Sequence, residues 1–318
     1  MTGNPIQHTQ KFIQEHIAWS QPECKHYPDY KLLHRMVTNH VEKYKKEYEK
    51  YFQSHELNSL SSDHTFRVST NVGYERHKEW HNKIFDNLFI VMNGKGQVID
   101  FKLTESTGFE YIRPLLKNIH NRAVERNTTI HLYSIDNCCN WKEKIGSIFG
   151  PQCAVKLDLY HAVQRITTTI QRKSPKYYSV VHDLRLVFRQ EGDIGRKRQL
   201  PTENPIKMDE NLLKFFQTWK EEDVFTDETH NAVQNLRKHI HDGCLDNIPV
   251  GVGTNRNERI HKTLNQTTSK IPRVSVQLMH NLLTLFFYKW NWNREHPTIP
   301  CPPIWDNKTV SKPPNSNS

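Results

Sequence analysis

The chain has 318 residues, of which 36% are hydrophobic and 10% aromatic, so it can bury one large core or two smaller ones and is not disordered by composition. Its formal net charge of +10 favours a polyanionic partner over a cationic ligand. Apolar runs are too short for a membrane span and the N-terminus does not resemble a signal peptide, so we expect no membrane attachment and no secretion. The six scattered cysteines predict reduced thiols.

Residues 1–56 are expected to be helical and subsidiary to the rest of the chain. Within them, 29–55 place apolar side chains on one stripe, which predicts a single long amphipathic helix. That helix packs on the next domain or docks onto DNA or a partner protein. Upstream, Cys24 and His26 have no second cysteine pair nearby, so a metal-binding module there is disfavoured.

Three antiparallel strands are expected next, over 64–69, 85–92 and 97–103. In the first, Phe66 and Val68 share one face, and Asp63 enters the strand pointing away from it. The Asn-Gly-Lys-Gly sequence between the second and third strands is a strong hairpin signal.

An apolar pattern then predicts a helix over 108–126, followed by a strand, helix, strand and helix. The strand 129–135 stops at Asp136, the helix 138–149 follows Asn137 as its N-cap, and the strand 154–157 stops at Asp158. Such a unit forces a parallel pair of strands with a right-handed crossover. It places Asp136 at the sheet edge where open α/β folds bind ligands, so Asp136 is the first catalytic candidate.

Past Asp158 the chain becomes basic. Between 165 and 198 nine Lys and Arg residues outnumber three acids. Helices are expected over 208–219 and 226–241, with a loop over 192–205. The basic residues indicate either phosphate contacts or a solvated surface, and Arg196–Arg198 also weakly matches a nuclear import signal.

A further helix begins near Asn255, with Glu258 and His261 on its polar face and Ile260 opposite. The apolar segment 274–292 contains polar residues and predicts a buried helix. Residues 296–318 are rich in proline and asparagine and predict an extended tail.

This order, βββαβαβα with acids on the first strand and after the fourth, resembles the ribonuclease H-like fold, in which strands one and four are neighbours. Asp-Leu-Tyr-His at 158–161 and the late Asn-Glu pair at 257–258 resemble DDE-type transposases of the Mutator-like group and related bacterial insertion-sequence transposases. Tyr160 stands where those proteins usually have Phe. The resemblance implies an α/β, mixed five-stranded sheet formed by 57–165 and 251–295, with an all-helical insertion over 166–250.

The resemblance also implies DNA cleavage and strand transfer on transposon ends and target DNA, in the nucleus or a bacterial nucleoid, and it leaves a homo-oligomer open. Asp63, Asp136 and Glu258 would hold two Mg²⁺ or Mn²⁺ ions, with Asp158 and His161 as auxiliary residues. Asp86 and Asp100, on the second or third strand, are the alternatives for the first acid. Expected DNA contacts are Arg172, Lys173, Arg196, Lys197, Arg198, Arg256, Arg259 and Lys262. No end-binding module is recognisable.

Other interpretations stay open. The chain could be a domesticated, catalytically inactive descendant that binds DNA or protein, and Asp158 or Glu258 could simply cap helices. A zinc site of Cys138, Cys139, Cys153 and His161 is disfavoured, because adjacent cysteines on a helix point about 100° apart.

Overall fold

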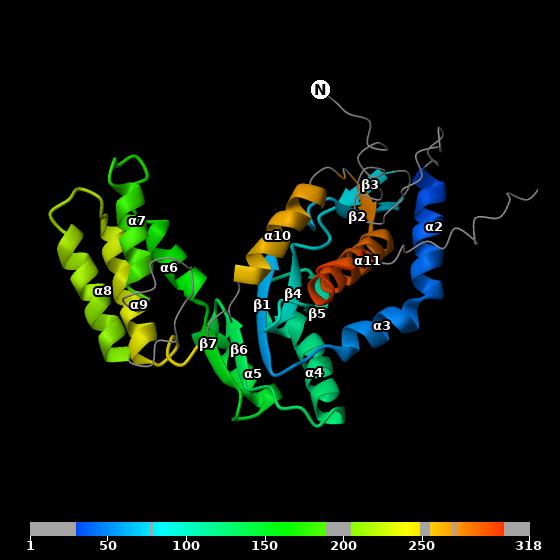
Figure 1. The fold of residues 1–318 in the computed structure, drawn as a ribbon. Coiled ribbons are helices and arrows are strands. Elements are labelled where there is room, and N and C mark those ends of the chain that lie inside the picture. Colours follow the sequence, from blue (N-terminus) through cyan, green and yellow to red (C-terminus); the bar gives the residue numbers. More distant parts are fainter. Residues whose placement is uncertain are drawn as a thin grey trace, which may run out of the picture.

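The computed structural model describes residues 30–76, 79–188, 205–248, 255–268, 271 and 273–301. These residues form an α/β fold with a five-stranded mixed sheet, a three-stranded sheet and ten helices. The large sheet stands at the centre, with α11, α2 and α3 on one side of the molecule and α6, α7, α8 and α9 grouped on the other (Figure 1).

The large sheet has the strand order β5-β4-β1-β6-β7. Its strands are β1 (Ser59–Thr65), β4 (Asn87–Asn93), β5 (Val98–Thr104), β6 (Leu132–Ile135) and β7 (Ala154–Leu157). β1 pairs with β4 in the antiparallel sense and with β6 in the parallel sense, and β7 is parallel to β6. The first and fourth strands of this sheet are therefore neighbours, and the crossover helix α5 (Cys138–Phe149) joins β6 to β7.

Both faces of the sheet are covered, which explains why β4 is buried along its whole length. Phe89 and Val91 face one hydrophobic core, together with α5 and α4 (Phe109–Glu125). The alternate residues Ile90 and Met92 face a second core, formed with α11 (Val276–Glu295) and α2 (Tyr30–Lys43).

The position of β1 differs from the expectation of a strand over 64–69. The strand lies earlier, Asp63 is inside it opposite Ile90, and Phe66 lies beyond its end with 56% of its surface exposed. The physical reason is that Ser61 and Ser62 are buried with hydrogen-bond partners. Ser61 donates to Asn257 and Ser62 accepts from the Tyr133 hydroxyl, so a polar sequence can form a central strand.

The helix expected over 29–55 is two helices. α2 ends at Lys43 and α3 (Lys45–Ser54) begins after Tyr44, which has φ −107° and ψ 20°. Both helices pack on α11, and α3 also reaches β5. The additional packing of α3 on β5 accounts for the break at Tyr44, which amphipathic spacing does not predict.

A small sheet that the sequence patterns did not predict has the order β3-β2-β8. Its strands are β2 (Val72–Arg76), β3 (Glu79–Asn82) and β8 (Val274–Ser275). The parallel pair of β2 and β8 joins the segment after β1 to the start of α11.

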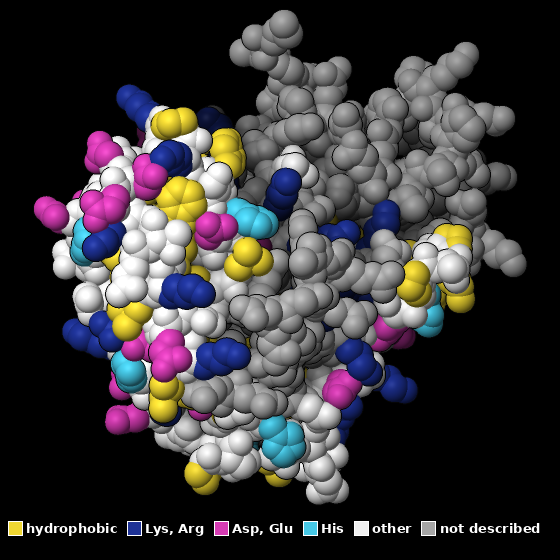
Figure 2. Space-filling view, turned by 60° about the vertical axis from the view of Figure 1, so that its left-hand side comes forward, with side chains coloured by type: hydrophobic (Ala, Val, Ile, Leu, Met, Phe, Trp, Pro, Cys, Tyr) yellow, Lys and Arg dark blue, Asp and Glu magenta, His cyan; other side chains and the backbone are white. Residues whose placement is uncertain are grey.

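Helices follow β7, the first of them almost entirely ahead of the expected insertion over 166–250 and the others within it. They are α6 (Leu159–Thr167), α7 (Tyr177–Leu186), α8 (Pro205–Trp219) and α9 (Asp227–His241). Arg196–Arg198 lie outside the described residues, as does most of the loop expected over 192–205. On the face shown in Figure 2, Lys and Arg are interspersed with Asp and Glu, so the described part of this face carries both signs of charge. Among the described residues, no helix is both long and apolar enough to cross a membrane.

Candidate active site

Asp63 and Asp136 lie at the same edge of the large sheet because their strands are parallel neighbours. The register pairs Ser61 of β1 with Ser134 of β6. Two residues further along both strands are Asp63, still in β1, and Asp136, directly after β6. The strand order thus brings together two acids that are far apart in the sequence.

Glu258 reaches the same edge because α10 (Asn255–Thr268) is anchored across β1 and β4. The fully buried Asn257 accepts a hydrogen bond from Ser61 Oγ at 2.9 Å and donates one to the carbonyl of Ile90 at 3.4 Å. Ile260 and Leu264 are fully buried on the core side of the same helix. This anchoring turns Glu258 and His261 toward Asp63.

The resulting acidic cluster comprises Asp63, Glu258 and His261, each with a potential ligand atom within 4.8 Å of the others. Asp63 Oδ2 lies 3.7 Å from His261 Nδ1 and 3.4 Å from His161 Nε2. His161 Nε2 is also 4.0 Å from Glu258 Oε1. Two carboxylates and two imidazoles from three separate chain segments therefore share one small volume.

Asp158 positions His161 beside the acidic cluster. It is the N-cap of α6, and its side chain accepts a hydrogen bond from the backbone N–H of His161 at 3.2 Å. Only 3% of Asp158 is exposed. The capping role considered for Asp158 is therefore present, and it positions the histidine that faces Asp63.

The charges in the cluster are mutually dependent. Burial raises the pKa of Asp63, but the close approach of His161 and His261 outweighs it and holds the pKa below the usual value. Burial lowers the pKa of His161, yet Asp63, assisted by Asp136 and Asp158, raises it to about 9. Burial and the negative charge of Asp63 raise the pKa of Glu258. At neutral pH a protonated His161 thus partly balances the clustered carboxylates.

Asp136 lies near this cluster, but its carboxylate is paired with Arg165. One guanidinium nitrogen of Arg165 donates to Asp136 Oδ1 and to the backbone carbonyl of Asp136, both at 2.7 Å. The side chain of Asp136 remains 48% exposed. The structure thus brings Asp63 and Glu258 together directly, and places Asp136 beside them in an ion pair.

The acidic cluster fits a hard divalent cation. Carboxylate oxygens are the preferred ligands of Mg²⁺ and Mn²⁺. The buried Nε2 atom of His261 also lacks a hydrogen-bond partner among the described residues. Such orphaned polar atoms in a buried site are expected where a ligand or solvent completes the arrangement.

Of the expected DNA contacts that the structure describes, one is bonded to the backbone and the others are exposed. Arg256 donates to the backbone carbonyl of Gly94, which ties it to the β4–β5 hairpin. Arg259 and Lys262 are exposed on α10, and Arg172 and Lys173 are exposed between α6 and α7.

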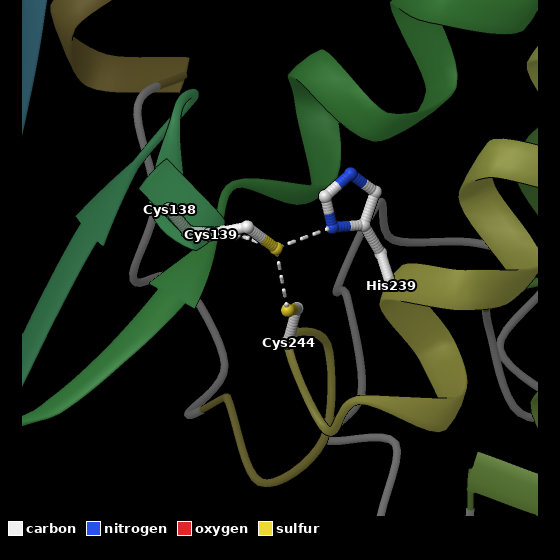
Figure 3. Close-up of side chains that lie close together, drawn as sticks. All are labelled: Cys138, Cys139, His239 and Cys244. Carbon is white, nitrogen blue, oxygen red and sulfur yellow. Dashed lines mark hydrogen bonds between the residues drawn. The ribbon is translucent and has the colours of Figure 1, made fainter. Parts of the chain in front are cut away.

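A second cluster contains sulfur. Cys138 and Cys139 lie with His239 and Cys244, and each offers a ligand atom within 4.8 Å of the others (Figure 3). The set considered from the sequence was therefore wrong in two members, since Cys153 is buried in the core and His161 faces the acidic cluster. Sequence analysis missed His239 and Cys244 as candidate ligands. Their spacing around Gly243 indicates a metal site only when the fold has brought them to Cys139.

No family model matches this chain, and no curated protein matches it either.

Proposed function

We propose that this protein is a metal-dependent enzyme that cleaves and joins DNA phosphodiester bonds, built on a ribonuclease H-like core of the DDE transposase type. The observation that carries the proposal is the convergence of Asp63 and Glu258, from a central strand and a late helix, with ligand atoms within 4.8 Å. Two such carboxylates, brought together across a long helical insertion, repel each other, and a bound cation would offset that repulsion.

The sheet supports the same proposal. Its order β5-β4-β1-β6-β7 makes the first and fourth strands neighbours, as the resemblance to the ribonuclease H-like fold implies. The first acid lies on the central strand and the second directly follows the fourth strand. The helix that carries the last acid packs on β1 and β4.

Different residues would bind the metal, position the site and contact DNA. Asp63 and Glu258 would hold Mg²⁺ or Mn²⁺, which when bound activates water and stabilises the attacking and leaving oxygens of phosphodiester cleavage. Asn257 and Asp158 fix the elements that present Glu258 and His161. The net charge of +10 and the exposed Arg259 and Lys262 favour a DNA backbone beside the site.

A second function is favoured by the ion pair of Asp136. With Arg165 bound to its carboxylate, the third acid is neutralised. This arrangement suits a catalytically inactive descendant that binds DNA or protein without cutting it. The two functions share a fold and differ in whether divalent metal supports cleavage.

The test is nicking of supercoiled plasmid DNA by the full chain with Mg²⁺ or Mn²⁺. We expect Asp63→Asn and Glu258→Gln each to reduce nicking by more than about 100-fold, the upper range for losing a residue that only supports a ligand. Asp86→Asn is the matched control, because Asp86 is an exposed acid ahead of β4.

DNA binding is measured in parallel, and its affinity should fall steeply with salt in every variant. Nicking that survives both substitutions would refute the active-site assignment. Salt-sensitive binding without nicking by the unaltered chain would favour the inactive descendant.

A further inference from the structure

We propose that Cys138, Cys139, His239 and Cys244 bind a Zn²⁺ ion that ties the start of α5 to the end of α9. The site is separate from the acidic cluster, and the proposal does not rest on the proposed function. Three thiols and one imidazole are a donor set that Zn²⁺ uses in structural sites.

The distances between donor atoms match a zinc tetrahedron. With Zn–S bonds of about 2.3 Å, two sulfurs of a tetrahedron lie about 3.8 Å apart, and a sulfur and an imidazole nitrogen about 3.6 Å apart. Here the Sγ atoms of Cys138 and Cys139 are 3.7 Å apart, and those of Cys139 and Cys244 are 3.5 Å apart. Cys139 Sγ lies 3.1 Å from His239 Nδ1. Small outward shifts therefore make room for the ion.

Adjacent cysteines can share one ion here because they occupy the first turn of a helix. Cys138 and Cys139 open α5, and their N-cap Asn137 makes no side-chain capping hydrogen bond. Backbone N–H groups in a first turn lack partners within the helix, and the helix dipole there favours negative charge. These N–H groups would face the net negative charge of a zinc ion bound by three thiolates.

The other two donors are brought together by the end of α9. Cys244 N–H donates to the His239 carbonyl at 2.9 Å, and Gly243 N–H donates to the Ile240 carbonyl at 3.1 Å. These two bonds define a Schellman turn, and Gly243 has the left-handed φ of +68° that it requires. Such a turn brings the side chains at its two ends into contact, and in this chain they are His239 and Cys244.

The turn is held in place by the large sheet. Leu157 N–H of β7 donates to the Cys244 carbonyl at 2.8 Å, and Lys156 Nζ donates to the Gly243 carbonyl at 2.8 Å. The Lys156 ammonium also forms an ion pair with Asp246, which follows Cys244 by two residues. Figure 3 shows Cys139 with dashed contacts to both His239 and Cys244.

Zinc binding has a consequence for Arg165. Without the ion, Arg165 Nη1 lies 3.0 Å from His239 Nε2, and because a guanidinium only donates, Nε2 accepts and Nδ1 carries the proton. Zinc on Nδ1 moves that proton to Nε2, which can then no longer accept from Arg165. The metal therefore removes one of the two partners of the guanidinium that also binds Asp136.

The experiment uses the full chain purified under reducing conditions, with metal content measured by mass spectrometry. We expect about one zinc per chain, lost in Cys244→Ala and in Cys139→Ala. Cys153→Ala is the matched control for Cys244→Ala, because Cys153 is also buried but lies outside the cluster, and it should retain zinc. Asp63→Asn should also retain zinc, which distinguishes this ion from one bound at the acidic cluster.

Should the cysteine variants fail to fold, Co²⁺ added to the unaltered metal-free chain provides an independent readout. Tetrahedral cobalt with thiolate ligands gives intense visible bands and sulfur-to-cobalt charge-transfer absorption, and zinc should displace both. Absence of zinc from reduced protein together with absence of those bands would overturn the proposal. So would zinc retained in Cys244→Ala and lost in Asp63→Asn.

Discussion

Arg165 holds Asp136 through a single guanidinium nitrogen, which donates to the carboxylate and to the backbone carbonyl of that residue, both at 2.7 Å. The arrangement neutralises an acid at the edge of the sheet beside the acidic cluster. Any cation that recruits Asp136 must compete with this guanidinium. Arg165 is therefore a potential control on the proposed active site.

We predict that Arg165→Gln increases metal affinity at the acidic cluster and raises cleavage. The substitution frees the Asp136 carboxylate and removes a positive charge near the cation, so Mn²⁺ should bind roughly tenfold more tightly. Mn²⁺ titration followed by plasmid nicking measures both effects. Arg113→Gln is the control, because Arg113 makes an exposed ion pair with Glu110 on α4. An unchanged Mn²⁺ affinity would show that Asp136 takes no part in the site.

Asn257→Ala should weaken both stability and the proposed activity. It leaves the buried Ser61 hydroxyl without its partner, at a cost of about 1–3 kcal/mol, and releases the helix that presents Glu258. Urea unfolding and plasmid nicking report the two effects. Gln266→Ala, on an exposed position of the same helix, should change neither. If nicking were unaffected by Asn257→Ala, Asn257 would not position Glu258.

Gly243→Ala is predicted to destabilise the protein by about 1–2 kcal/mol and to weaken zinc binding. Gly243 has φ +68°, where a side chain is strained, and its turn sets the contact of His239 with Cys244. Gly146→Ala in α5 is a matched control, since a Cβ there meets nothing within 4 Å and should stabilise the helix slightly. Thermal unfolding with and without zinc distinguishes the two. Equal zinc dependence in both variants would contradict the role of the turn.

Stability should fall as the pH drops from about 6.5 toward 4, in part because of His40. Its Nε2 lies 2.8 Å from the Tyr48 hydroxyl, and burial, with a contribution from Lys43, lowers the pKa of His40 to about 4. Between about pH 6.5 and 4, His40 is protonated in the unfolded chain but neutral in the folded chain. Lowering the pH through this range therefore favours unfolding. His40→Gln should lessen the decrease in unfolding free energy between pH 7 and 5. An identical decrease in both proteins would mean that His40 does not contribute.

The sequence by itself determined the local elements around the candidate site. The strand Ala154–Leu157 and the helix Cys138–Phe149 have the expected bounds. Asp136 directly follows a buried strand, as the pattern predicted. These features follow from hydrophobic periodicity, caps and glycine or proline stops, all of which act between residues close in the chain.

Only the tertiary structure decided where β1 begins and which side chains meet. Ser61 and Ser62 of β1 are buried because Asn257 and Tyr133 supply their hydrogen bonds, and these partners are distant in the chain. The pairing of Arg165 with Asp136 and the approach of Cys244 to Cys139 likewise depend on how helices pack against the sheet edge. The sequence pattern does not show which partner a polar side chain will bond to. That partner depends on burial and geometry after the elements assemble.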